Sequence, residues 1–177
     1  MSQCSWKLDD SWKVKQAKAA IFDKKGPSLD NTLKSSYGYY AYFNPAKKST
    51  AGEIVSQIVP GEVNSYCFQM WYYLNSPEQV SLTMFLLQNK KYIGPLMQLK
   101  NNQIGDWQFA SYHIDININA SVVLRAKKKS INIGDIAVDD LIITEGNCPV
   151  SLINSVIDCY DKMKNDLKVI YIQISLI

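Results

Sequence analysis

The residues of this chain best suited to chemistry are carboxylates and cysteines in strand-like surroundings. Asp139 and Asp140 lie side by side in the middle of the apolar run from Gly134 to Cys148. A carboxylate in such a run is costly to bury unless it is paired, hydrogen-bonded or bound to a cation. Two interpretations follow from the residues themselves. The pair either caps backbone amides inside the domain or contributes oxygen ligands to a hard cation such as calcium.

The chain has four cysteines, Cys4, Cys67, Cys148 and Cys159. None forms a Cys-x-x-Cys pair, which argues against a structural zinc site. Both disulfides in an oxidising compartment and buried thiols in a cytosolic protein are compatible with these spacings.

Catalysis has little support in the sequence. The single histidine, His113, lies in an alternating strand-like run, where a packed or surface imidazole is the ordinary interpretation. There is no Gly-x-Ser-x-Gly elbow and no glycine-rich phosphate loop after a strand. Tyr66 and Phe68 flank Cys67 and would bury its thiol rather than activate it. We therefore expect a protein that is not an enzyme.

The amino-acid composition of the chain is typical of a single globular domain. The chain has 177 residues, 47% of them hydrophobic and 20% charged, with a net charge of +3. That charge is small for a nucleic-acid binder, so we expect no nucleic-acid partner. Because the N-terminus lacks the pattern of a signal peptide and no apolar run reaches roughly 18 residues, we expect a module of a longer secreted or membrane protein.

The pattern along most of the chain is that of an antiparallel all-β domain, with alternating runs separated by turn residues. We expect a loop over 13–25, and the alternation does not distinguish a sandwich from a barrel. After Cys148 the pattern changes to apolar residues at helical spacing, followed by an apolar end. We therefore predict a domain over 1–148 and a C-terminal tail over 149–177, partly helical or undefined. The expected strands are 37–43, 53–59, 66–74, 79–88, 95–100, 108–119, 121–126 and a last one within 134–148.

Several motifs in fixed order resemble the MAM domain, an extracellular module of meprins, neuropilins and certain receptor tyrosine phosphatases. The resemblance covers roughly residues 4 to 148. The family's second cysteine is missing, and Leu124-Arg125-Ala126 replaces the usual Phe-Glu-Ala. The motifs are Gly26-Pro-Ser-Leu-Asp30, the aromatic run after Tyr37, the aromatic run after Cys67, the segment leading to Trp107, and Gly134-Asp-Ile-Ala-Val-Asp-Asp-Leu141 with Cys148.

The resemblance implies a two-sheet jelly-roll sandwich in an extracellular setting, with a disulfide between Cys67 and Cys148. It leaves Cys4 without its usual partner, so Cys4 is free, pairs with Cys159, or pairs outside the chain. Some members of the family hold a cation, which implies Asp30, Asp139 and Asp140 as ligands for calcium or another structural cation. No cofactor is required.

The function implied is a non-catalytic interaction or adhesion module that binds a protein partner, homophilically or heterophilically, with membrane attachment only through other parts of the parent protein. Asn119, in the one Asn-x-Ser sequon, is the expected glycosylation site. The alternatives are an accessory domain of a secreted metalloprotease, a carbohydrate-binding jelly roll with an exposed line of aromatic residues, and a cytosolic thiol protein. The lysine pairs and triplet form either a polyanion-binding face or solvated hairpin tips; they are Lys24-Lys25, Lys47-Lys48 and Lys127-Lys128-Lys129.

Overall fold

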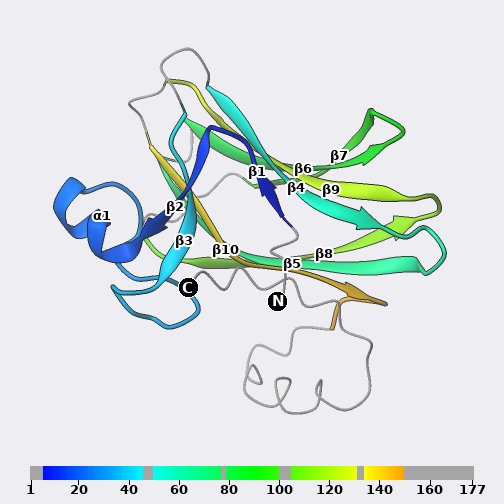
Figure 1. Ribbon diagram of the computed structural model, residues 1–177, viewed down its shortest axis with the longest axis horizontal. Helices are drawn as coiled ribbons and strands as arrows, with labels where there is room; N and C mark the ends of the chain where they lie inside the picture. Colours follow the sequence, from blue (N-terminus) through cyan, green and yellow to red (C-terminus); the bar gives the residue numbers. More distant parts are fainter. Residues whose placement is uncertain (1–5, 46–49, 77–78, 100–104, 131–133, 150–177) are drawn as a thin grey trace.

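The computed structural model describes residues 6–45, 50–76, 79–99, 105–130 and 134–149. Within these ranges the chain forms ten strands and one helix (Figure 1). The elements are β1 (Lys7–Leu8), β2 (Trp12–Gln16), α1 (Ala17–Asp23), β3 (Tyr39–Phe43), β4 (Ala51–Val59), β5 (Asn64–Asn75), β6 (Val80–Gln88), β7 (Lys91–Leu99), β8 (Gln108–Ile116), β9 (Ala120–Lys128) and β10 (Asp135–Glu145).

The strands form two five-stranded antiparallel sheets that face each other. Sheet A has the order β1-β4-β9-β6-β7, and sheet B has the order β2-β3-β10-β5-β8. Figure 1 shows the two sheets as separate layers, with β5, β8, β6 and β9 running roughly along the long axis of the molecule and β2 and β3 crossing it steeply. The predicted all-β jelly-roll sandwich is confirmed.

The core lies between the sheets because each strand turns alternate side chains inward. In β6, Val80, Leu82, Met84 and Leu86 are buried and face the other sheet. They pack with the inward residues of β5, β9 and β10. Trp6 and Trp12 are also buried in this core, and their indole nitrogens have no hydrogen-bond partner. The other two tryptophans, Trp71 and Trp107, lie outside it and are only partly buried.

A second, smaller cluster covers one end of the outer face of sheet B. Tyr40 and Tyr42 of β3 pack there with Tyr73 of β5, and α1 covers them with Ala17. The Tyr40 hydroxyl donates a hydrogen bond to the carbonyl oxygen of Pro27 at 2.8 Å. The prediction of a loop over 13–25 is wrong, because this segment forms β2 and α1. The sequence does not predict this helix, because it has seven residues and buries only two alanines and so shows no apolar periodicity.

Strand boundaries differ from the sequence predictions mainly at hairpins. The predicted strand over 95–100 begins earlier, at Lys91, since Asn89 and Lys90 take the two positive φ values of a tight turn. Lys128 was expected on a polyanion-binding face or a solvated hairpin tip, but it lies in β9 with its side chain buried over the rings of Tyr42 and Phe43. Burial lowers the pKa of the Lys128 ammonium.

The predicted tail over 149–177 lies, from residue 150 on, outside the described residues, as do Cys4 and Cys159. Within the described part of the chain, no helix is long and apolar enough to cross a membrane.

Candidate interaction surface

The structure joins Cys67 and Cys148 by a disulfide, the pairing that the family resemblance implied. Cys67 lies in β5 on the outer face of sheet B, and Cys148 follows the end of β10, the neighbouring strand. The link closes a sequence separation of 81 residues. Cys67 is fully buried beneath the segment that carries Cys148, so the bond holds that segment against the sheet.

Asp30, Asp139 and Asp140, which the sequence singled out as a set, are brought together around one loop. Asp30 accepts hydrogen bonds at 2.8 Å from the backbone amides of Leu33 and Ser35, each on a different carboxylate oxygen. This caps the turn that follows Asp30 from within. The loop therefore has its shape fixed by its own first carboxylate.

The other two aspartates attach the same loop to β10. Asp139 accepts a hydrogen bond from the backbone amide of Asn31 at 2.9 Å and another from that of Asp140, also at 2.9 Å. Asp140 accepts one from the Asn31 side-chain amide at 2.8 Å and one from the Thr32 hydroxyl at 2.7 Å. A register shift in β10 after Asp139, with Asp140 at a φ of 49°, turns both carboxylates toward the loop.

Asp139 is the most strongly perturbed acid of the three. Its side chain is buried, with a residue exposure of 2%. Burial, and secondly the charge of Asp140, raises the pKa of Asp139 to about 7, against backbone hydrogen bonds that lower it. Asp139 therefore titrates near neutral pH in the folded protein.

All six carboxylate oxygens of these aspartates accept a hydrogen bond. In the part of the chain that the structure describes, no group of three or more His, Cys, Asp or Glu residues is arranged to hold a metal ion. The three acids thus have a structural use that requires no cation. The calcium site stays a prediction.

The remaining chemical candidates, His113 and Cys67, lie opposite each other in the register of β8 and β5. His113 is on the outer face of sheet B, with Nε2 3.0 Å from the carboxylate of Asp115 two residues away, and both side chains are exposed. The Cys67 sulfur is engaged in the disulfide. Cys67 therefore offers no free thiol to the neighbouring His113.

A cleft of about 500 Å³ lies between the free edges of the two sheets. One wall is the β6–β7 hairpin and the other is β8 with the turn that follows it. Figure 1 shows the tip of the β6–β7 hairpin bending away from sheet B, which opens this edge of the sandwich. The residues that line the cleft are Leu86, Gln88, Ile93, Leu96, Tyr112, His113, Ile114, Asp115, Asn117 and Ile118.

The cleft has an apolar floor and a mixed rim. Leu86 and Ile114, which belong to the core, form its buried part. Ile93 and Ile118 are 45% and 48% exposed at the rim, beside the polar pair of His113 and Asp115. An apolar centre with polar groups around it is typical of a recognition surface. The sequence analysis missed this cleft, although an isoleucine in a turn, Ile118, was a signal available to it.

Asn119, the predicted glycosylation site, lies in the exposed turn between β8 and β9, next to the cleft residue Ile118. Its side-chain oxygen accepts a hydrogen bond from the backbone amide of Gly61 at 3.0 Å. The accessible turn is compatible with a glycan, and glycosylation stays a prediction.

A charged cluster on the outer face of sheet A was also absent from the sequence predictions. Arg125 of β9 donates a hydrogen bond from Nε to Glu53 of β4 at 2.7 Å, and the Tyr92 hydroxyl donates to the other Glu53 oxygen at 2.8 Å. The Arg125 guanidinium lies 4.8 Å from the Phe85 ring centroid and 4.7 Å from that of Tyr92. Its groups satisfy one another, so we assign the cluster to tying β7 to β4 and β9 within sheet A.

The lysines expected to form one polyanion-binding face are not equivalent. Lys24 and Lys25 are exposed after α1 and Lys127 is exposed in β9, whereas Lys128 is buried. Lys47 and Lys48 lie outside the described residues.

The fold and the surface define a disulfide-linked jelly-roll module with an open cleft at one edge. The model of the family "MAM domain, meprin/A5/mu" matches residues 1–149, and the chain belongs to this family. The match covers the domain that the sequence analysis identified.

Curated relatives carry the same domain within much longer chains. The chain is 26% identical over 121 residues to MAM domain-containing glycosylphosphatidylinositol anchor protein 1 of Rattus norvegicus, which covers 63% of this chain and 12% of that protein. The Gallus gallus protein of the same name is 25% identical over 119 residues, with the same coverage. The aligned region is thus a small part of these relatives.

Among solved structures, the chain is similar to a cleaved adhesin domain of Lys-gingipain from Porphyromonas gingivalis, with a TM-score of 0.53 and 11% identity over 82% of this chain and 94% of that one. It is also similar to an endo-1,4-beta-D-xylanase of Clostridium thermocellum complexed with xylohexaose, with a TM-score of 0.50 and 12% identity over 83% of this chain and 27% of that one. These likenesses show the shared fold.

Proposed function

We propose that this domain is a non-catalytic extracellular interaction module that binds a protein partner, in adhesion or recognition, within a larger secreted or membrane protein. The observation that carries the proposal is the cleft at the β7–β8 edge. Its floor is apolar, its rim carries the exposed Ile93 and Ile118, and its volume is about 500 Å³. Membership of an extracellular module family and the disulfide support the setting.

The cleft suits a protein partner because a neighbouring side chain can enter between the two sheet edges. The apolar floor would accept an aliphatic or aromatic anchor, and His113, Asp115 and Gln88 offer hydrogen-bonding groups around it. Buried anchors of this kind carry most of the affinity of protein interfaces. The interface can be homophilic or heterophilic, and one assay distinguishes the two.

The test is bead aggregation and cell-surface binding by the protein secreted and displayed in multivalent form. Homophilic binding would aggregate coated beads, and heterophilic binding would label cells without bead aggregation. Replacing Ile93 and Ile118 by Glu should weaken whichever binding occurs by at least about tenfold, since hot-spot truncations exceed about 1 kcal/mol each.

The matched control is Val14→Glu. Val14 is 44% exposed, close to the values of the two isoleucines, and lies in β2, the strand at the opposite edge of sheet B. This variant should bind like the unchanged protein. Binding that survives the isoleucine changes, or that is lost equally with Val14→Glu, would reject the cleft as the recognition site.

A role as an accessory domain of a secreted metalloprotease is compatible with the same surface, because the relatives are several times longer than the matched region. In that case the partner would be a substrate or another subunit. A carbohydrate-binding role has less support. In the described residues, the exposed aromatic side chains fall on different elements instead of along one strand face; they are Phe22, Tyr37, Tyr39, Tyr92 and Phe109.

A further inference from the structure

In helix α1 the small side chains face the domain and the large apolar side chains face solvent. The residues that face the domain are the small Ala17 and Ala20, both buried. Phe22 is 76% exposed, and Ile21 beside it is exposed as well. Residue 22 lies five and two positions after these alanines, so helix geometry directs Phe22 away from the sheet. The largest apolar side chain of the helix therefore contributes little to the fold.

Tyr37 extends this apolar surface. The backbone amide of Lys18 donates a hydrogen bond to the carbonyl oxygen of Ser36, which places the 36–38 segment beside α1. The exposed Tyr37 ring then lies 5.2 Å from the Lys18 ammonium. Lys18 precedes Ile21 and Phe22 by three and four positions, so the three residues share one side of the helix. We call Lys18, Ile21, Phe22 and Tyr37 the α1 tip.

The charge around the α1 tip is positive. Lys18, Lys24 and Lys25 are exposed. The nearest acid, Asp23, is already paired, because Lys15 contacts its carboxylate at 2.8 Å. Asp23 also interacts with Lys25, so one carboxylate is outnumbered by the lysines around it and the charge at the tip stays positive.

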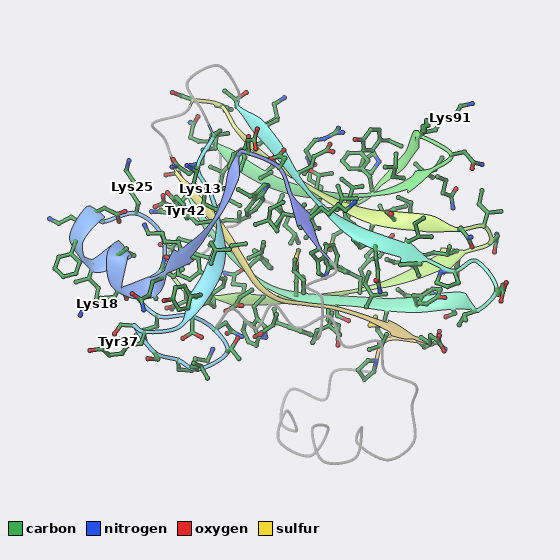
Figure 2. The ribbon with its side chains drawn as sticks, in the orientation of Figure 1. Lys13, Lys18, Lys25, Tyr37, Tyr42 and Lys91 are labelled. Atoms are coloured by element: carbon green, nitrogen blue, oxygen red, sulfur yellow. A yellow bond between two sulfur atoms is a disulfide. The ribbon has the colours of Figure 1, made fainter. Side chains whose placement is uncertain are left out.

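We propose that the α1 tip docks on an anionic lipid bilayer surface. Exposed Phe and Ile side chains bordered by lysines match an interface in which apolar groups enter the acyl boundary and cations contact headgroups. Tyr37 has the amphipathic ring that is enriched at that depth. The tip projects from the end of the domain (Figure 2), and a projecting apolar tip fits a deformable bilayer better than it fits a preformed protein groove.

Membrane docking is independent of the partner cleft. Figure 2 places Lys18, Lys25 and Tyr37 at one end of the long axis and Lys91, which begins β7 beside the cleft, at the other. A domain docked through α1 would thus leave its cleft free for a partner.

The test is flotation of the full chain with vesicles of phosphatidylcholine alone or with about a third phosphatidylserine. We expect binding to the anionic vesicles only, weakened by salt. Replacing Ile21 and Phe22 by Ser should reduce the bound fraction about tenfold. Replacing Lys18 and Lys25 by Gln should reduce it on the order of tenfold as well.

Matched controls lie elsewhere on the domain. Ile58→Ser with Val63→Ser removes two exposed apolar side chains around the β4–β5 connection, and Lys90→Gln with Lys91→Gln removes two lysines at the end of the domain opposite α1. Both should bind vesicles like the unchanged protein, and all variants should keep their circular dichroism spectrum.

Three outcomes would overturn the proposal. The first is absence of binding to anionic vesicles, and the second is binding that the α1-tip changes do not reduce. The third is an effect of the Ile21 and Phe22 changes on self-association or on binding to a purified protein, with vesicle binding unaffected. That last result would assign the tip to a protein partner.

Discussion

Strand β10 is attached to its surroundings in two different ways. Beyond its end, Cys148 is bonded covalently to Cys67 of β5. Midway, Asp139 and Asp140 hold the loop after Asp30 by hydrogen bonds alone. The first attachment acts mainly by restricting the unfolded chain, whereas the second depends on buried polar groups being satisfied in the folded state. The two should therefore respond to different perturbations, the first to reductant and the second to pH.

The largest expected effect is the loss of the covalent attachment. Replacing Cys67 and Cys148 by Ala should lower the free energy of unfolding by about 4 kcal/mol, given the long loop that the bond closes. Urea denaturation would measure it. The unchanged protein with reductant is the matched control and should show a similar loss. A decrease below roughly 1 kcal/mol in both would mean that the bond does not constrain the domain.

The next effect is a pH dependence specific to Asp139. Its pKa is raised from an ordinary value of 3.8 to about 7 in the folded protein, so the folded state binds the proton more tightly than the unfolded chain. Stability from this group is fully present below pH about 4 and is lost as pH rises through about 7, with a slope of up to about 1.4 kcal/mol per pH unit.

Asp139→Asn isolates this contribution. Its free energy of unfolding should vary less between pH 4 and 7 than that of the unchanged protein, because the variant side chain does not titrate. Other acids are common to both proteins and cancel in the difference. Parallel pH profiles for the two proteins would contradict the burial of a titrating Asp139.

A smaller effect is expected at Asn31. Asn31→Ala removes the side-chain bond to Asp140 and the bond accepted from Lys34, while leaving the backbone bond to Asp139. The free energy of unfolding should fall by about 1 kcal/mol. Asn147→Ala is a suitable control, since the Asn147 side chain is exposed and its bond to Ser65 is long, at 3.3 Å. Equal effects of the two changes would mean that the loop attachment contributes nothing particular.

The smallest effect should come from chelation. The three aspartates are satisfied by hydrogen bonds, so adding EDTA or calcium should shift Tm by less than about 2 °C, equivalent to less than roughly 1 kcal/mol. A larger, saturable rise with calcium that disappears in Asp139→Asn would instead establish the cation site implied by the family resemblance.

The contrast between the two attachments also explains what could be predicted from sequence. Cysteines are rare and have few partners, so Cys67 and Cys148 could be paired once the family was recognised. A carboxylate can bind an amide, a hydroxyl or a cation, so the grouping of Asp30, Asp139 and Asp140 could be predicted but its use could not. Five of the six donors that satisfy them come from 31–35, a turn-rich segment with no periodic pattern, and the sixth is the Asp140 backbone amide.

The strands could be predicted from the alternation of apolar and polar residues, because their inward side chains build the core. The β7–β8 cleft and helix α1 could not be predicted in this way, because their exposed apolar residues do not belong to the core. Ile93, Ile118 and Phe22 are apolar residues left outside the core, and a pattern that assigns apolar residues to the interior cannot identify them. Their exposure became evident only with the bend of the β6–β7 hairpin and the burial of alanines by α1.

The most direct test of the central claim, an oxidised extracellular module, is peptide mapping under non-reducing conditions of the protein expressed through a secretory pathway. We predict a linked pair of peptides containing Cys67 and Cys148, and the same map would show the state of Cys4 and Cys159. A folded, soluble product with four free thiols would contradict the claim and favour a cytosolic thiol protein.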